Sequence, residues 1–74
     1  MKIVINYCKM CGGQGEADAV AAEIKQYFDL DAELVDVSKG RFEVIVEGRT
    51  IFSKAQTGRF PLKGEIAKLL RAGK

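Results

Sequence analysis

The segment "KIVINYCKMCGG" (Lys2–Gly13) joins an apolar, β-branched run to two cysteines three positions apart and a pair of glycines. Its first part, Lys2–Tyr7, is short and almost continuously apolar, which predicts a buried strand covered on both faces. After Gly13 the apolar residues recur at helical spacing as far as Phe28, with carboxylates in the first turns, where they suit the helix dipole. The cysteines are therefore expected in a loop between a strand and a helix.

The second half of the chain returns to strand character. Ala32–Val37 predicts a strand, and Ser38–Arg41 has the composition of a turn. The next stretch, "FEVIVEGRTIF" (42–52), predicts a hairpin that turns at Gly48. Pro61 suits the first turn of a final helix. The apolar stripe of that helix is expected to comprise Leu62, Ile66, Leu69 and Leu70.

The expected order of elements is β-α-β-β-β-α. A strand, helix and strand in sequence form a right-handed crossover, so the first two strands should be parallel. The hairpin then adds antiparallel strands, which gives a four-stranded mixed sheet. This is a small α/β architecture of thioredoxin-like type, expected as one domain over residues 1–74. Its cysteine loop lies at the carboxyl end of a strand, where open α/β folds place their sites.

The composition is that of a small globular protein. Of the 74 residues, 47% are hydrophobic and 30% charged, with two cysteines and no histidine, which argues against disorder and against a disulfide-rich scaffold. A net charge of +2, without a patch of mixed aromatic and basic residues, argues against nucleic-acid binding. No apolar stretch approaches the length of a membrane span, so no membrane association is expected and the location is expected to be cytoplasmic.

Charge is divided unevenly along the chain. Residues 1–37 carry three lysines against seven carboxylates, whereas residues 38–74 carry nine Lys or Arg against three glutamates. The pattern favours two oppositely charged, solvated faces. The alternative is a basic docking surface for a partner protein.

The two cysteines are the chemical feature of the sequence. Thiols separated by two residues can close a small disulfide ring and reopen it, provided that a thiolate is accessible. The start of a helix and the cation of Lys9 both favour the thiolate, while Gly12 and Gly13 permit a tight turn. We therefore interpret Cys8 and Cys11 as a redox pair that works without a permanently bound metal or organic cofactor.

Other interpretations of the pair stay open at this point. A zinc site needs four ligands, so it would require a dimer that pools four thiolates, or a carboxylate ligand. A structural disulfide across so short a loop would remove little entropy from the unfolded chain. Two inert, reduced thiols are a third possibility. A redox-sensitive binding module, in which oxidation changes the affinity for a protein partner, is the alternative to a protein that turns over.

Four pieces of sequence carry a resemblance to a known family. They are "YCKMCG" (7–12), "GRFEV" (40–44), "SK" (53–54) and "GRFP" (58–61). With them the chain resembles the selenoprotein W-like (Rdx) family, from Lys2 to about Leu70. The resemblance implies a thioredoxin-like fold and a thiol or selenol oxidoreductase role, associated with glutathione in several members. The partners that it implies are therefore protein thiols or glutathione.

The resemblance bears on which thiol attacks. Cys8 matches the family's cysteine, and Cys11 matches the position that is selenocysteine in animal members. In thioredoxins the first cysteine attacks, which would be Cys8, whereas the family's selenium position favours Cys11. Proximity to the start of the helix also favours Cys11. A peroxide-scavenging role is a special case, in which the attacking thiolate becomes a sulfenic acid that condenses with the other thiol.

A second expectation concerns the loop that faces the cysteines. Thioredoxins carry a cis-proline there, but the corresponding stretch "SKGRF" (38–42) contains no proline. Gly40, Arg41 and Phe42 are predicted to face the cysteines instead. Met10, between the cysteines, is predicted to be exposed and to contact a substrate, because methionine adapts to varied surfaces.

Overall fold

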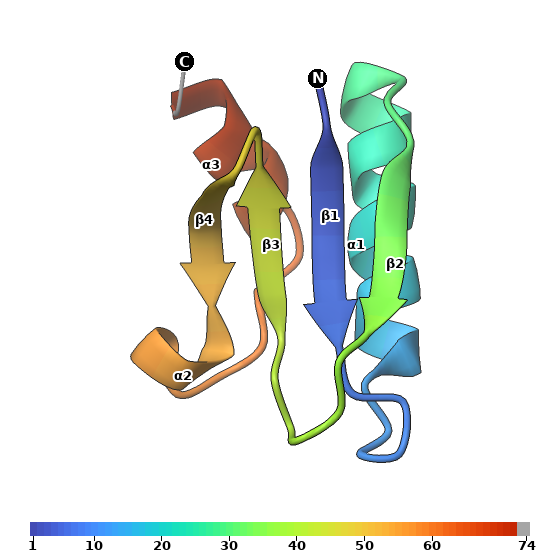
Figure 1. Cartoon of the computed structure of the whole chain (residues 1–74). Coiled ribbons are helices and arrows are strands. Elements are labelled where there is room, and N and C mark those ends of the chain that lie inside the picture. Colours follow the sequence, from blue (N-terminus) through green and yellow to red (C-terminus); the bar gives the residue numbers. More distant parts are fainter. Residues whose placement is uncertain (73–74) are drawn as a thin grey trace.

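The computed structural model describes residues 1–72 and shows the predicted order of elements with one addition. The elements are β1 (Ile3–Tyr7), α1 (Gln14–Phe28), β2 (Ala32–Asp36), β3 (Glu43–Val46), β4 (Arg49–Ser53), α2 (Lys54–Thr57) and α3 (Glu65–Ala72) (Figure 1). The addition is the short helix α2. Positions 73 and 74, which the predicted domain includes, lie outside the described residues.

The four strands form one mixed sheet in the order β2-β1-β3-β4. β1 pairs with β2 in parallel, while β1 with β3 and β3 with β4 are antiparallel. The hairpin turns at Glu47 and Gly48, whose positive φ angles of 51° and 79° match the two-residue turn that suits the twist of the strands. The predicted β-α-β-β-β-α order and the thioredoxin-like mixed sheet are therefore confirmed.

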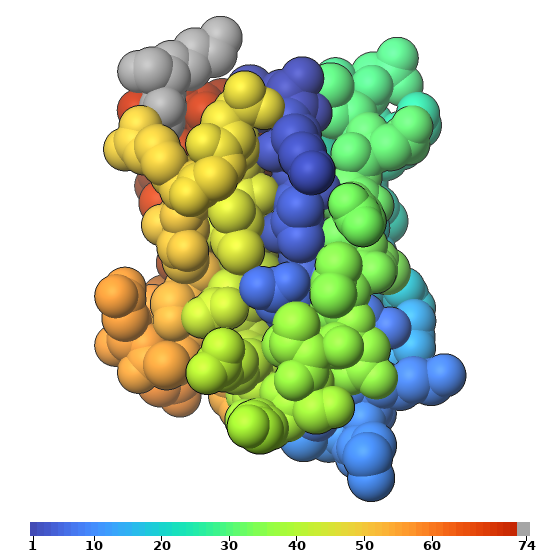
Figure 2. All heavy atoms as spheres, in the orientation of Figure 1, coloured from blue at the N-terminus to red at the C-terminus, as the bar shows by residue number. Residues whose placement is uncertain are grey.

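One face of the sheet carries the core. Figure 1 shows α1 and α3 on the same side of the sheet, and their buried side chains pack against alternate residues of β1, namely Ile3, Ile5 and Tyr7. The residues between them, Val4 and Asn6, are only half-buried, because among residues 1–72 no element covers the second face of the sheet (Figure 2). The expectation of cover on both faces of the first strand was therefore wrong.

The last helix begins later than the proline signal predicted. α3 starts at Glu65, and Leu62, expected in its apolar stripe, is 65% exposed. Gly64 has a φ of +84°, which places a turn between Pro61 and the helix. The Glu65 carboxylate accepts hydrogen bonds from the Arg59 guanidinium at 2.7 and 3.0 Å and from the Leu62 N–H at 2.9 Å. These bonds, that of Arg59 first, lower the pKa of Glu65 to about 2.

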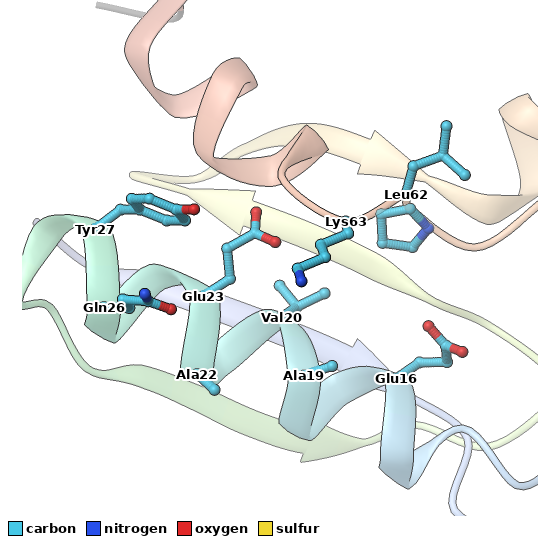
Figure 3. A pocket seen from close by; sticks show the side chains of 10 residues that line it. Glu16, Ala19, Val20, Ala22, Glu23, Gln26, Tyr27, Leu62 and Lys63 are labelled. Atoms are coloured by element: carbon cyan, nitrogen blue, oxygen red, sulfur yellow. The ribbon is translucent and has the colours of Figure 1, made fainter.

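The two long helices are joined by a carboxylate. Glu23 on α1 accepts hydrogen bonds from the backbone N–H groups of Gly64 at 2.8 Å and Ala67 at 2.9 Å, which cap the start of α3. A cavity of about 380 Å³ lies beside this joint, between α1 and the segment 61–63 (Figure 3). Its lining includes neither cysteine, and the Glu23 carboxylate is already used by the cap. We therefore interpret this cavity as a gap left where α1 packs against the segment before α3, and not as a functional site.

Candidate functional site

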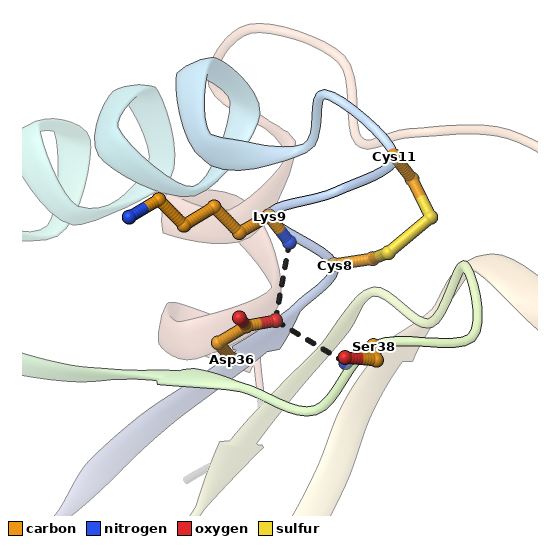
Figure 4. The surroundings of a disulfide bond; sticks show 5 residues. All are labelled: Cys8, Lys9, Cys11, Asp36 and Ser38. Carbon is orange, nitrogen blue, oxygen red and sulfur yellow. Dashed lines mark hydrogen bonds between the residues drawn. A yellow bond between two sulfur atoms is a disulfide. The ribbon is translucent and has the colours of Figure 1, made fainter.

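The two cysteines lie at the carboxyl end of β1, in the loop that leads into α1. Cys8 directly follows the last residue of the strand, and Cys11 lies in the turn before the helix. Their sulfur atoms are joined in a disulfide, with 5.2 Å between the Cα atoms (Figure 4). The predicted pair is thus at bonding distance.

Two hydrogen bonds and two glycines shape this loop. The N–H of Gly12 donates to the carbonyl of Lys9 at 3.1 Å, and the N–H of Gly13 donates to the carbonyl of Cys8 at 2.9 Å. This nested pair is the pattern that ends a helix with a left-handed residue, and Gly12 supplies that residue with a φ of +83°. Gly13 has an ordinary φ of −81°, but a Cβ there would lie 3.0 Å from the backbone oxygen of Cys8. The two glycines are therefore needed for different reasons.

Replacing Gly13 with alanine is expected to destabilise the protein by about 1–3 kcal/mol, because the added Cβ overpacks against the Cys8 backbone. Gly15→Ala is the matched control. Gly15 lies in the first turn of α1, and a Cβ there would meet no atom within 4 Å. Alanine at this helical position is expected to stabilise by about 0.5–1 kcal/mol. Urea unfolding of both oxidised variants measures the difference, and equal stabilities would contradict the close approach at Gly13.

The two cysteines differ in exposure. Cys8 is only 3% exposed, whereas Cys11 is exposed to solvent. Met10 between them is 91% exposed, as the sequence predicted. A reagent in solution can therefore approach the disulfide from the Cys11 side.

Asp36 joins the cysteine loop to the loop that follows β2, a role that the sequence analysis missed. Its Oδ1 accepts hydrogen bonds from the backbone N–H groups of Lys9 at 3.2 Å and Ser38 at 3.3 Å (Figure 4). The bond to Ser38 is the local Asx turn that an aspartate two residues before Ser38, in the stretch Asp-Val-Ser-Lys-Gly, could have indicated. The bond to Lys9 depends on the parallel pairing of β1 with β2, which places the two strand ends side by side.

Only some of the residues predicted to support the cysteine pair contribute to the structure around the disulfide. The side chain of Lys9 points away from the disulfide in Figure 4, so this residue contributes its backbone N–H to the site. Gly40 and Arg41 lie in the loop that Asp36 ties to the cysteine loop. The side chain of Phe42 is 1% exposed and belongs to the core, where it packs edge-on against Phe60.

No metal-binding cluster accompanies the pair within residues 1–72. The Cys, Asp and Glu side chains of this part of the chain form no group of three or more that could hold an ion. In the same residues, none of the helices combines the length and apolar character needed to cross a membrane.

Comparison with known proteins identifies the family. The family model described as Rdx family matches residues 2–72, which is nearly the whole chain. This chain belongs to the Rdx family. The family and a CxxC pair at disulfide distance together indicate a redox function.

Solved structures of similar proteins agree with this Rdx fold. A selenoprotein W-related protein from Vibrio cholerae is 26% identical with a TM-score of 0.88, and the match covers 96% of this chain and 92% of that one. A protein from Bordetella parapertussis is also 26% identical, with a TM-score of 0.91 and coverage of 99% and 96%. The thioredoxin-like arrangement is thus shared with selenoprotein W-related structures.

Curated relatives of this Rdx chain include two mammalian proteins. Migration and invasion enhancer 1 from Bos taurus is 31% identical over 72 residues, or 96% of this chain. The protein of the same name from Mus musculus is 31% identical over 70 residues, or 93% of this chain. The chain spans 63% and 61% of the length of these two relatives.

Proposed function

We propose that this chain is a thiol–disulfide oxidoreductase that passes two electrons from the Cys8–Cys11 dithiol to a disulfide of a protein or glutathione partner. The observation that carries the proposal is the pairing of one exposed and one buried cysteine in a single disulfide, in the loop after β1. An exposed sulfur can meet a partner, and a buried neighbour can then displace that partner. The same pair supports the reverse reaction, in which a thiol reduces the Cys8–Cys11 disulfide.

The proposed reaction has two exchange steps. The Cys11 thiolate attacks one sulfur of the partner disulfide, so a Cys11–partner bond forms, the partner's S–S bond breaks and one partner thiolate leaves. The Cys8 thiolate then attacks Cys11 Sγ, which forms the Cys8–Cys11 disulfide and releases the second partner thiolate. The partner gains two electrons, and this chain loses two. A thiol reductant of the glutathione class restores the dithiol by the same steps in reverse.

The backbone around the pair supports a thiolate there. Gly13, the residue that precedes α1, lies against the backbone of Cys8 and makes no side-chain capping bond. The first N–H groups of a helix have no partner within the helix, and they favour a nearby negative charge. A glycine at this position therefore leaves the end of the helix uncapped beside the cysteine loop.

The test is the reduction potential of the pair. The purified protein is equilibrated in glutathione buffers of graded ratio, and free thiols are then trapped and counted by mass spectrometry. We expect a reversible two-electron transition at or above the cytosolic poise, which is roughly −220 to −320 mV depending on the method. The variant with both cysteines changed to serine is the control and should show no transition.

Two outcomes would overturn the proposal. A pair that stays reduced even in the most oxidising buffer would not pass its electrons to glutathione disulfide. A pair that cycles, but gives no multiple turnover with a thiol reductant and a disulfide substrate, would instead make the chain a redox-sensitive binding module.

A further inference from the structure

A basic groove lies on the side of the 38–42 loop away from the cysteines. It is lined by the loop and by α2, namely by Lys39, Gly40, Arg41, Phe42, Glu43, Lys54, Ala55 and Gly58, and it has a volume of about 360 Å³. That volume lies within the range of ligand sites in proteins. We call this feature the α2 groove.

The charges of the α2 groove are predominantly positive. Lys39 and Arg41 are exposed, and Lys54 is half-exposed, with its ammonium 4.8 Å from the centre of the Phe60 ring. The single acidic residue in the lining, Glu43, accepts a hydrogen bond from the Asn6 amide at 3.3 Å across the open face of the sheet. The groove therefore presents three cations and one carboxylate that already has a partner.

The groove and the disulfide share one edge of the molecule. Figures 1 and 2 show the 38–42 loop between the cysteine loop and α2, along the end of the sheet where β1, β2 and β4 finish. Asp36 ties this loop to the cysteine loop through Lys9 and Ser38. A molecule bound in the groove is thus held beside the site of exchange.

The shape of the loop is unusual for its residues. Ser38, Lys39 and Gly40 all have positive φ angles, of 62°, 59° and 70°. Non-glycine residues adopt this conformation at an energetic cost, and such residues cluster at functional sites. Here the conformation lets the loop turn sharply between the disulfide and the groove while carrying two basic side chains.

We propose that the α2 groove binds an acidic segment of the disulfide-bearing polypeptide on which the cysteine pair acts. This inference rests on the proposed function and adds a substrate class to it. A ligand that reaches both Cys11 and the α2 groove must extend past the 38–42 loop, and a polypeptide segment is long enough to do so. Carboxylates on that segment complement Lys39, Arg41 and Lys54, and complementary charge raises the rate at which partners associate.

The test compares two peptides with the reduced protein. Each peptide has one cysteine activated as a pyridyl disulfide; in one it is flanked by glutamates, and in the other by glutamines at the same positions. The rate of thiopyridone release is measured at low salt. We expect the glutamate peptide to react about tenfold faster, as electrostatic steering does in other systems, and the preference to shrink as salt is added.

Two sets of charge variants locate the preference. In the variant Lys39→Gln, Arg41→Gln, Lys54→Gln, the ratio of the two rates should fall to about twofold or less. The variant Lys2→Gln, Arg49→Gln, Lys68→Gln removes the same charge from exposed positions outside the groove and should keep most of the ratio. Because Lys54 packs on Phe60, the double variant Lys39→Gln, Arg41→Gln is measured as well, and its ratio should fall part of the way.

Each contrary result has its own meaning. An unchanged ratio in the groove variants, or an equal fall in both triple variants, would overturn the groove proposal. So would an equal loss of the groove variant's rate with oxidised glutathione, since the groove would then serve a small tetracarboxylate. If the wild-type protein reacts with the neutral reagent dithiodipyridine but shows no preference for the glutamate peptide, only the groove proposal is refuted. If the reduced protein does not react with dithiodipyridine, the proposed oxidoreductase function itself is refuted.

Discussion

Changing Cys11 to serine is expected to slow the first exchange step with an external disulfide by about 100-fold or more, whereas Cys8→Ser is expected to leave that step intact. The reason is the difference in exposure, since Cys11 faces solvent and Cys8 is only 3% exposed. For Cys8 to attack, the loop would first have to open. An opening free energy of about 2.7 kcal/mol corresponds to about 100-fold in rate.

The two variants should also differ in where the reaction stops. Cys8→Ser has no second thiol to displace the partner, so it should accumulate a stable mixed disulfide at Cys11, which intact-mass spectrometry detects. Cys11→Ser should show little adduct over the same time. Circular dichroism of both variants checks that they fold. The variant with both cysteines changed to serine gives the background rate of reaction. If Cys11→Ser reacted as fast as Cys8→Ser, burial would not select the attacking thiol, and Cys8 would take the role of the first cysteine of thioredoxins.

The sequence was sufficient for the parts of the fold that local patterns determine. The strand before Cys8, the helix after Gly13 and the turn at Gly48 each follow from apolar periodicity or turn chemistry over a few neighbouring residues. The helix Lys54–Thr57 was missed because four residues are too few to show a period. The late start of the last helix was missed because Pro61 fits a first turn, while the turn at Gly64 gives a weaker signal.

Apart from the local bond between Asp36 and Ser38, the features of the site that were missed depend on contacts between distant segments. The pair itself was evident from its spacing, but the burial of Cys8 and the exposure of Cys11 depend on how the loop packs on the core. Asp36 reaches Lys9 only because β1 and β2 pair in parallel. Phe42 was expected in a loop facing the cysteines from its place in the chain. Its aromatic side chain, directly before β3, is instead buried in the core, because burial of so large an apolar group is favourable.

Phe42→Ala is expected to cause the largest loss of stability among substitutions away from the cysteines. Its ring is 1% exposed, the largest of the fully buried side chains, and removing such a ring costs about 3–5 kcal/mol. A chain of this length has about 4–11 kcal/mol of stability in all. The variant should therefore lose a large part of the stability of the protein. The same residue also supports the α2 groove, because its carbonyl accepts a hydrogen bond from the Lys54 N–H at 2.9 Å.

Phe60→Ala is the matched control for this prediction. Phe60 is half-buried and forms the edge-on pair with Phe42 at 5.3 Å between ring centres, so both substitutions remove the same aromatic contact, worth about 0.5–1.5 kcal/mol. The difference between the two variants thus isolates the burial of Phe42, and we expect it to be about 2 kcal/mol or more. Urea unfolding of both proteins, with the disulfide kept oxidised, measures it. Equal losses would show that the pair, rather than the burial of Phe42, stabilises the loop between the cysteines and the groove.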